Sequence, residues 1–201
     1  MRNGSMGRLS RVLVVALVTL MAQACGNVGG TASNVSPTPT LSVPEIPQAE
    51  MIYYHVSGTS LPNIRYSLDT NRPNRQPYDA YVGWSVDWMF GGGGHCDPGS
   101  AVVNVTSMTV SFPRLVEEDG PVAKTLIRIW NRYADALAMH EAGHVQIVFD
   151  ALPPMQEAMR AASDCDAAAS IGRDWLHRIE EQQIAYDNTT DHGETQGAYF
   201  Y

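Results

Sequence analysis

A single apolar stripe between Pro121 and Asp150 constrains the fold of this chain more than any other feature. Its members recur at steps of three and four residues, which is the spacing of one face of an α-helix. Pro121 suits the first turn of such a helix, and Pro153-Pro154 is expected to end it. The pattern therefore predicts an amphipathic helix of about thirty residues with one buried face. The stripe comprises Leu126, Ile129, Trp130, Tyr133, Leu137, His140, His144 and Ile147.

Two histidines of this stripe belong to an H-E-x-x-H pentapeptide, His140-Glu141-Ala142-Gly143-His144. Residues four apart on a helix lie one above the other, so both imidazoles can reach a single zinc ion. Glu141 lies about 100° further round the helix, where it can polarise a metal-bound water without being a ligand. The alternative is a helix with two partly buried histidines and an unrelated glutamate. We interpret His140 and His144 as zinc ligands and Glu141 as a general base.

The segment before this helix predicts a small sheet. A short apolar-aromatic run at 51–56 is typical of a strand. At 81–90 and 101–112 successive residues alternate between two faces, which is typical of half-buried strands. Pro113 is expected to end the third strand. The second and third strands could pair as an antiparallel hairpin with a long loop.

The helices complete a prediction of fold class. Ser60 is a candidate N-cap for a short helix that ends near residue 71. A second long helix is predicted from residue 154 to about residue 186, before a turn-forming tail at 187–193. Strands followed by long helices indicate an α+β domain. We expect a small antiparallel or mixed sheet packed on two long helices, the first of which carries H-E-x-x-H.

The N-terminus is typical of an exported protein. A basic stretch with three arginines precedes a short apolar run at 12–21, and Ala22-Gln23-Ala24 matches a small-x-small cleavage pattern. Residues 1–24 are therefore interpreted as a signal peptide. Cys25 follows the cleavage point, which favours a bacterial lipoprotein with lipid attached to Cys25. Ordinary signal-peptidase cleavage at the same bond is the alternative.

Composition divides the exported part into a tether and one domain. Residues 25–47 are rich in Gly, Ser, Thr and Pro and predict an extended tether, whereas 48–201 has the size of a single domain. Removing the three leader arginines from 13 basic residues leaves 10 against 21 acidic ones, a net charge of −11. Such an acidic surface argues against nucleic acid or anionic lipid as a partner. We expect the protein to contact a membrane only through lipid on Cys25. The expected location is the cell envelope, at the outer membrane or in the periplasm, and secretion is the alternative.

Three cysteines in an exported chain leave an odd one. If Cys25 is acylated, Cys96 and Cys165 remain as a pair, and an oxidising compartment allows a disulfide between them to persist. That bond would close a long loop around the H-E-x-x-H helix and stabilise the domain by about 4 kcal/mol in the chain-entropy description. Two buried free thiols are the alternative.

A catalytic zinc site usually has three protein ligands and one open position. Asp150 has the spacing of the third ligand in metzincin peptidases, but Ile147 stands where that class needs a glycine to turn the chain back. We therefore interpret Asp150 as a solvated helix residue. His192, in a turn 48 residues beyond His144, is a further candidate, and an exposed tail is its alternative. Three acids expected on the second helix, where gluzincins place their third ligand, are interpreted as surface charges: Glu157, Asp164 and Asp166.

The remaining histidines and one tyrosine have weaker cases for a role in the site. We expect His55 and His177 to have core or surface roles. His95 adjoins a run of four glycines and could line a cleft. Tyr186 could donate to an oxyanion, although packing is the favoured role.

Four groups of residues occur in one order along the chain: Tyr53-Tyr54-x-Val56-x-Gly58-x-Ser60, Trp84-x-Val86-x-Trp88, the pentapeptide, and Tyr186-Asp187-x-x-Thr190-x-His192-Gly193. Together they resemble a bacterial domain-of-unknown-function family whose members are described as predicted secreted zinc-dependent proteases. The resemblance covers roughly 50–198, nearly the whole domain. It implies a zincin-like fold, a bound Zn²⁺, and His192 as the third ligand beside His140 and His144.

The expected function is that of a secreted or lipid-anchored zinc metallopeptidase. A zinc-activated water would hydrolyse peptide bonds, with Glu141 as general base. A peptide or protein would be the substrate, and a strand edge near 101–112 could align it by backbone pairing. The alternative is a non-catalytic, zinc-stabilised envelope lipoprotein with a binding or assembly role. A metal-free adhesin or scaffold is a third candidate.

Overall fold

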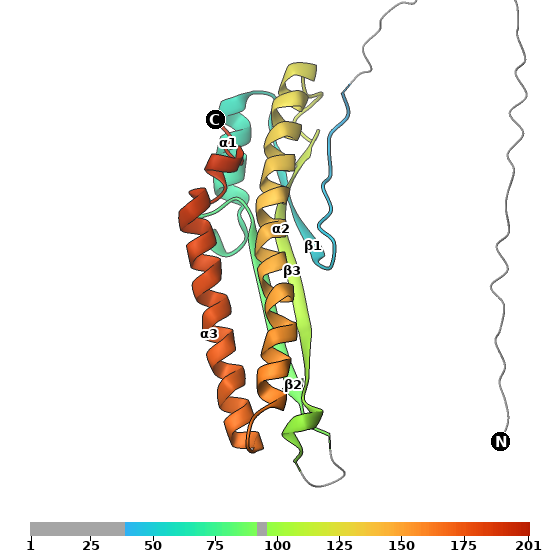
Figure 1. Cartoon of the computed structure of the whole chain (residues 1–201). Helices are drawn as coiled ribbons and strands as arrows, with labels where there is room; N and C mark the ends of the chain where they lie inside the picture. Colours follow the sequence, from blue (N-terminus) through green and yellow to red (C-terminus); the bar gives the residue numbers. More distant parts are fainter. Residues whose placement is uncertain (1–38, 92–95) are drawn as a thin grey trace, which may run out of the picture. The chain divides into compact units, whose positions relative to one another are not determined.

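A three-stranded mixed sheet and two long antiparallel helices form the core of the domain. The computed structural model describes residues 39–91 and 96–201 (Figure 1). The elements confirm the α+β class, with a small sheet and two long helices of which the first carries H-E-x-x-H. In chain order they are β1 (Glu50–Ser57), α1 (Leu61–Asn71), η1 (Pro73–Arg75), β2 (Tyr81–Met89), η2 (Pro98–Ser100), β3 (Val102–Val116), α2 (Lys124–Arg160), α3 (Cys165–Thr190) and η3 (Glu194–Gln196).

The sheet has the order β1-β3-β2, with β3 in the middle. β2 and β3 pair antiparallel, which confirms the predicted hairpin, whereas β1 runs parallel to β3 and makes the sheet mixed. The prediction that Pro113 ends the third strand is wrong, because β3 continues to Val116. β2 pairs with β3 only as far as Ser111, so Pro113 lies where β3 pairs with Tyr54 of β1. The backbone nitrogen of Pro113, which carries no hydrogen, can face the edge of β3 that is no longer paired with β2.

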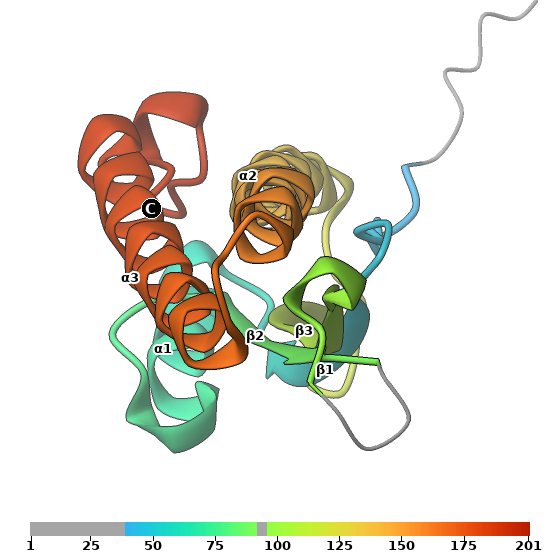
Figure 2. The same cartoon turned by 60° about the horizontal axis from the view of Figure 1, so that its bottom comes forward.

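α2 lies over one face of the sheet (Figure 2). Most of the predicted apolar stripe is on its buried side. Trp130 and Tyr133 are 1% and 2% exposed, and they pack edge-to-face with each other and with Phe200 from the end of the chain. Burial of these three rings anchors the C-terminal segment against α2. The buried members of the stripe are Leu126, Trp130, Tyr133, Leu137, His140 and His144.

The predicted break at Pro153-Pro154 is wrong, since α2 continues through both prolines to Arg160. Proline inside a helix costs about 3 kcal/mol, so other contacts must hold the last turns. Met155 and Met159 supply apolar burial, because both are fully buried in a cluster with residues of β3 and α3. Arg160 also donates from Nε to a backbone carbonyl beside β3 at 2.8 Å.

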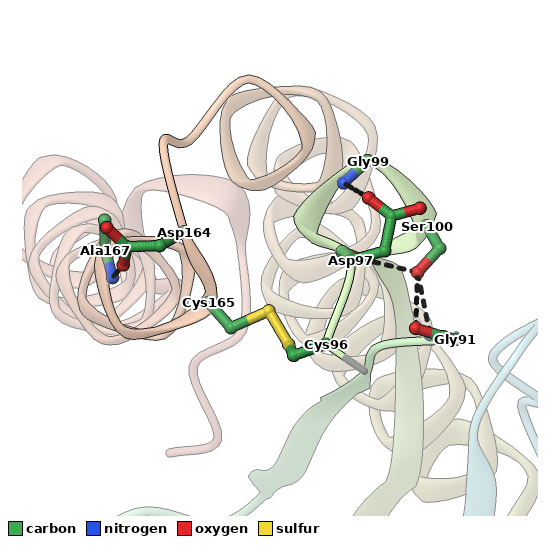
Figure 3. The surroundings of a disulfide bond; sticks show 8 residues. All are labelled: Gly91, Cys96, Asp97, Gly99, Ser100, Asp164, Cys165 and Ala167. Atoms are coloured by element: carbon green, nitrogen blue, oxygen red, sulfur yellow. Dashed lines mark hydrogen bonds between the residues drawn. A yellow bond between two sulfur atoms is a disulfide. The ribbon is translucent and has the colours of Figure 1, made fainter. Parts of the chain in front are cut away.

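α3 runs back along α2 in the opposite direction (Figure 1). Its N-cap is Asp164, whose side chain accepts a hydrogen bond from the backbone N–H of Ala167 at 2.8 Å (Figure 3). The sequence predicts an end near Tyr186, but the helix continues to Thr190. Thr190 is buried and its hydroxyl donates to the carbonyl of Tyr186 at 2.8 Å. Packing therefore overrides the turn-forming tendency of Asp187 and the residues after it, which belong to the helix.

The structure joins Cys96 and Cys165 in a disulfide, with Cα atoms 6.3 Å apart (Figure 3). Cys96 lies in the connection between β2 and β3, and Cys165 is the first residue of α3. Asp97 orders the same connection, because its side chain accepts a hydrogen bond from the backbone N–H of Gly99 at 2.9 Å. The bond thus fastens the start of α3 to the hairpin.

Part of the predicted tether packs against the domain. Ile46 is buried in the core. The backbone N–H of Ser42 donates to Asn131 Oδ1 on α2 at 2.9 Å, and Asn131 Nδ2 donates to the carbonyl of Thr40 at 2.7 Å. The packed unit therefore begins within the segment 25–47.

Several sequence predictions fall on residues that the structure does not describe. The predicted signal peptide (1–24), the candidate lipidation site Cys25 and the candidate cleft residue His95 lie outside the described ranges. Among the residues that are described, no helix combines the length and the apolar character needed to cross a membrane.

A largely buried carboxylate fastens the loop before β2 to two helices. Asp79 is 13% exposed and accepts hydrogen bonds from Arg65 of α1 at 2.6 and 3.0 Å and from Arg72 Nε at 2.9 Å. Tyr133 of α2 donates its hydroxyl to the same carboxylate at 2.7 Å. Burial alone would raise the pKa of Asp79, but the hydrogen bonds from Arg65 and Tyr133 outweigh it and hold the pKa below its usual value.

We expect Asp79→Asn to lower the free energy of unfolding by about 3 kcal/mol, because it removes the buried counter-charge of two largely buried guanidinium groups and leaves them only the half-exposed Asp69. A lowered pKa means that Asp79 contributes this stability above its unfolded-state pKa of 3.8 and loses it as pH falls through the folded-state pKa. The difference in free energy of unfolding between variant and wild type, measured by urea unfolding, therefore disappears in acid.

Asp69→Asn is the matched control. Asp69 binds the same arginines but is 51% exposed, so we expect a loss below about 1 kcal/mol. Equal losses in the two variants would contradict this explanation.

Candidate metal centre

His140 and His144 of α2 meet the C-terminal end of α3. The two helices run antiparallel, so the order of facing residues is reversed between them. His140 lies close to Asp187, and His144, four residues later on α2, also contacts Gln183, four residues earlier on α3. His144 Nε2 lies 2.9 Å from Asp187 Oδ1, and His140 Nε2 lies 3.2 Å from the same oxygen. The two Nε2 atoms are 3.2 Å apart. Three possible ligand atoms, His140 Nε2, His144 Nε2 and Asp187 Oδ1, therefore form a small donor triangle.

Two glutamines fix the orientation of both imidazoles. His140 Nδ1 donates to Gln196 Oε1 at 3.0 Å, and His144 Nδ1 donates to Gln183 Oε1. Gln183 Nε2 donates to the backbone carbonyl of His144 at 3.0 Å, and Gln196 Nε2 donates to Tyr186 Oη at 3.1 Å. Because the amide nitrogens act as donors, each amide oxygen is the acceptor and each Nδ1 carries the proton. Both Nε2 atoms then present lone pairs toward the carboxylate.

The converging lone pairs fit a bound cation, because without one they repel each other. Burial, and then the charge of His144, lower the pKa of His140, so the neutral form that binds metals is favoured. Ligand atoms in a tetrahedral zinc site, with bonds of about 2.0–2.1 Å, are about 3.3 Å apart, close to the spacing seen here. Within the described residues, the group whose donor atoms all lie within 4.8 Å of one another is His140, His144 and Asp187.

Tyr186 and two glycines complete the packing around the histidines. The Tyr186 ring stacks on His140, with centroids 5.1 Å apart and planes 11° apart, and meets His144 edge-on at 5.0 Å. Its hydroxyl lies over Gly143, where any Cβ would overlap it. Gly193 has a φ of 86°, and a Cβ there would lie 2.9 Å from His140 Cγ. Tyr186 therefore packs against both imidazoles, in agreement with the favoured expectation, and Gly143 is required by this packing.

Glu141 is only 4% exposed. Burial, and then the charge of Asp187, raise the pKa of Glu141 to about 8. A carboxyl group with this pKa can take up and release a proton near neutral pH, as a general base and acid must.

In the metal-free protein we expect Glu141→Gln to increase stability at neutral and alkaline pH. The folded state keeps a proton on Glu141 up to about pH 8, whereas the unfolded chain releases it near 4.5. Wild-type stability therefore falls as pH rises through this window, and the variant lacks this loss. The free energy of unfolding of the variant is therefore expected to exceed that of wild type by on the order of 3 kcal/mol at pH 8. Thermal unfolding in chelator at pH 5, 6.5 and 8 measures it, and a difference independent of pH would contradict the explanation.

A cleft of about 520 Å³ opens beside these residues. It is lined by the outer strand β2 and the loop before it, by α2, and by the end of α3 with the segment that follows. The expected strand edge at 101–112 does not line this cleft, whereas β2 does. Residues 102–108 of β3 pair with β2 alone, so their open edge lies away from the residues that line the cleft. The lining residues include Tyr78, Tyr81 and Trp84 together with His140, Glu141 and Asp187.

A family model described as bacterial protein of unknown function (DUF922) matches residues 51–193, more than half of the chain. The chain belongs to this family. The matched range spans His140, His144 and Asp187, and the match confirms the resemblance to a bacterial domain-of-unknown-function family. No curated protein and no solved structure matches the chain.

In this DUF922 domain His192 lies beside the donor triangle. Its Nδ1 is 3.7 Å from Asp187 Oδ1, and its ring stacks on Tyr78 with centroids 4.4 Å apart. His192 stays the sequence-based prediction for the third ligand, and Asp187 is the candidate ligand that the structure adds.

The remaining candidates lie on the surface of the DUF922 domain. Asp150 is exposed and accepts a hydrogen bond from Gln146 at 2.6 Å. Glu157 is exposed near the end of α2, and not on the second helix as predicted. Four others are exposed as well: Asp164 and Asp166 at the start of α3, His55 in β1 and His177 in α3.

Sequence reasoning missed Asp187, Gln183 and Gln196 as members of the site. Gln183, Asp187 and Thr190 recur at steps of four and three, so they share one face of α3. This stripe was the signal that could have found Asp187, but a helix ending at Tyr186 leaves Asp187 in the tail. Gln196 follows the helix in a short turn, and no sequence pattern of this DUF922 chain connects it with His140.

Proposed function

We propose that the chain is an exported zinc metallopeptidase whose zinc is held by His140, His144 and Asp187. The observation that carries the proposal is the convergence of three lone-pair donors in a cleft, together with the buried Glu141. Three protein ligands leave one position for water or substrate, which is the arrangement of catalytic zinc sites. The resemblance to predicted secreted zinc-dependent proteases supports the same function.

Glu141 is the proposed general base. Zinc, when bound, supplies a lowered pKa for a coordinated water and polarises the peptide carbonyl. Glu141 accepts the proton of the attacking water and passes it to the leaving amine. In the metal-free protein burial raises the pKa of Glu141, which favours uptake of a proton by this carboxylate. Gln183 and Gln196 keep both imidazoles in the orientation that turns Nε2 toward the metal.

β2 is the strand proposed to align the substrate. One edge of β2 pairs with β3, and as the outer strand it can add an extended peptide at the other edge by backbone hydrogen bonds. Tyr81, Val82 and Trp84 of β2 line the same cleft as Glu141. Tyr78 and Tyr81 are 43% and 50% exposed, so they offer aromatic surface to apolar side chains of the peptide.

The proposed location is the cell envelope. The signal-peptide pattern of residues 1–24 and the position of Cys25 support export with a lipid anchor. The disulfide between Cys96 and Cys165 supports an oxidising compartment. The partner is then a peptide or protein substrate, and the membrane is contacted through the lipid.

Incubation of the purified exported protein with a mixed peptide library tests the proposed function. We expect cleavage detected by mass spectrometry, loss of cleavage in chelator, and its return with one equivalent of zinc. The non-catalytic, zinc-stabilised alternative predicts that chelator lowers the Tm while the zinc-loaded protein cleaves nothing. A protein that neither binds zinc nor cleaves peptides would contradict both.

A further inference from the structure

The turn after α3 holds three consecutive residues in the left-handed conformation. Asp191 and His192 both have a φ of 50°, and Gly193 has a φ of 86°. Two non-glycine residues in this region are strained, so surrounding contacts must hold them there. The backbone N–H of His192 donates to the carbonyl of Asp187 at 2.9 Å, and that of Gly193 donates to Thr190 Oγ1 at 3.3 Å. The turn is therefore fixed to the helix end that carries Asp187.

This turn sets the ring of His192 against Tyr78, which belongs to the loop before β2. The ring planes are 25° apart, and Tyr78 Oη lies 3.3 Å from His192 Nε2. Tyr78 is 43% exposed and the side chain of His192 is 40% exposed, and both residues line the cleft. The pair thus presents an O–H and a ring nitrogen to the space beside the donor triangle.

His192 is less well placed than Asp187 to be a metal ligand. The atoms of the donor triangle are 2.9 to 3.2 Å apart, and His192 is not a member of that compact group. Its Nδ1 lies 3.7 Å from Asp187 Oδ1, and its Nε2 is paired with Tyr78. A fourth protein ligand would also close the position that a catalytic site leaves open.

We propose that His192 and Tyr78 bind substrate and not metal, by donating hydrogen bonds to the carbonyl oxygen of the peptide bond under attack. The inference rests on the proposed peptidase function. That oxygen gains negative charge in the transition state, so donors held beside it stabilise the transition state more than the bound substrate. The 3.3 Å contact between the two side chains is long for a hydrogen bond from a hydroxyl group, which leaves both able to turn to a substrate.

Three variants test the inference: His192→Ala, His192→Gln, which keeps a donor, and Tyr78→Phe, which keeps the ring and removes the hydroxyl. We expect His192→Ala to retain one zinc per chain with an affinity within about threefold of wild type, while kcat falls about 100-fold. Tyr78→Phe is expected to lower kcat about 10-fold, and His192→Gln to restore part of the loss. A phosphinic peptide, which carries a charged tetrahedral centre, is expected to bind zinc-loaded His192→Ala more weakly by a factor similar to the loss in kcat.

Loss of zinc from His192→Ala would overturn the inference, because His192 would then be a ligand. Wild-type kcat and wild-type affinity for the phosphinic peptide in both His192→Ala and Tyr78→Phe would overturn it as well. Failure of the proposed function has a different signature. Zinc-loaded wild-type protein would then cleave no peptide in the library, and the inference would fall with it.

Discussion

Asp187→Ala is expected to weaken zinc binding by more than about 100-fold. Changes in residues that only orient zinc ligands already cost about 10–100-fold in metal affinity, and this variant removes a charged ligand atom. His140 and His144 keep their hydrogen bonds to Gln196 and Gln183, so the helices remain folded around a site with two ligands. Competition with a chromophoric zinc chelator measures the affinity.

Asp174→Ala is the matched control for this variant. Asp174 is an exposed carboxylate on the same helix, so its removal changes the net charge equally and leaves the donor triangle intact. We expect its zinc affinity to stay within about threefold of wild type, because exposed charges are screened by salt. Wild-type zinc affinity in Asp187→Ala would show that this carboxylate is not a ligand.

Glu141→Gln is expected to keep one zinc per chain and to lower kcat by about 10²- to 10⁴-fold. The amide preserves the size of the buried side chain but cannot accept the proton of the attacking water. Turnover of a peptide identified in the library, measured together with zinc content, separates loss of chemistry from loss of metal.

Glu180→Gln provides the comparison for this second variant. Glu180 is exposed and lines the same cleft, so the substitution removes an acid near the site without touching the proposed base. We expect kcat within about threefold of wild type. If Glu141→Gln turns over peptides as fast as Glu180→Gln does, Glu141 is not the general base.

The sequence was sufficient to predict the helix that carries H-E-x-x-H, because its buried face and its chemistry coincide on one stripe. His140 and His144 lie on that stripe at a spacing that only a helix brings together, and both are buried. The antiparallel pairing of β2 and β3 also followed from local alternation. These features depend on residues close in sequence, which is why they could be predicted.

The ends of the elements could not be predicted, because contacts between distant residues determine them. α2 continues through Pro153-Pro154 because Met155 and Met159 are buried against β3 and α3. α3 continues past Tyr186 because Thr190 is buried against α2. The second case matters for the site. One additional helical turn moves Asp187 from a predicted tail to a position facing both histidines.

X-ray absorption at the zinc edge of the zinc-loaded wild-type protein tests the central claim most directly. We predict nitrogen and oxygen ligands at about 2.0–2.1 Å, with the outer scattering of two imidazoles, from His140 and His144, and a carboxylate oxygen from Asp187. The scattering of three imidazoles would contradict the proposed ligand set, because His192 would then bind the metal in place of Asp187.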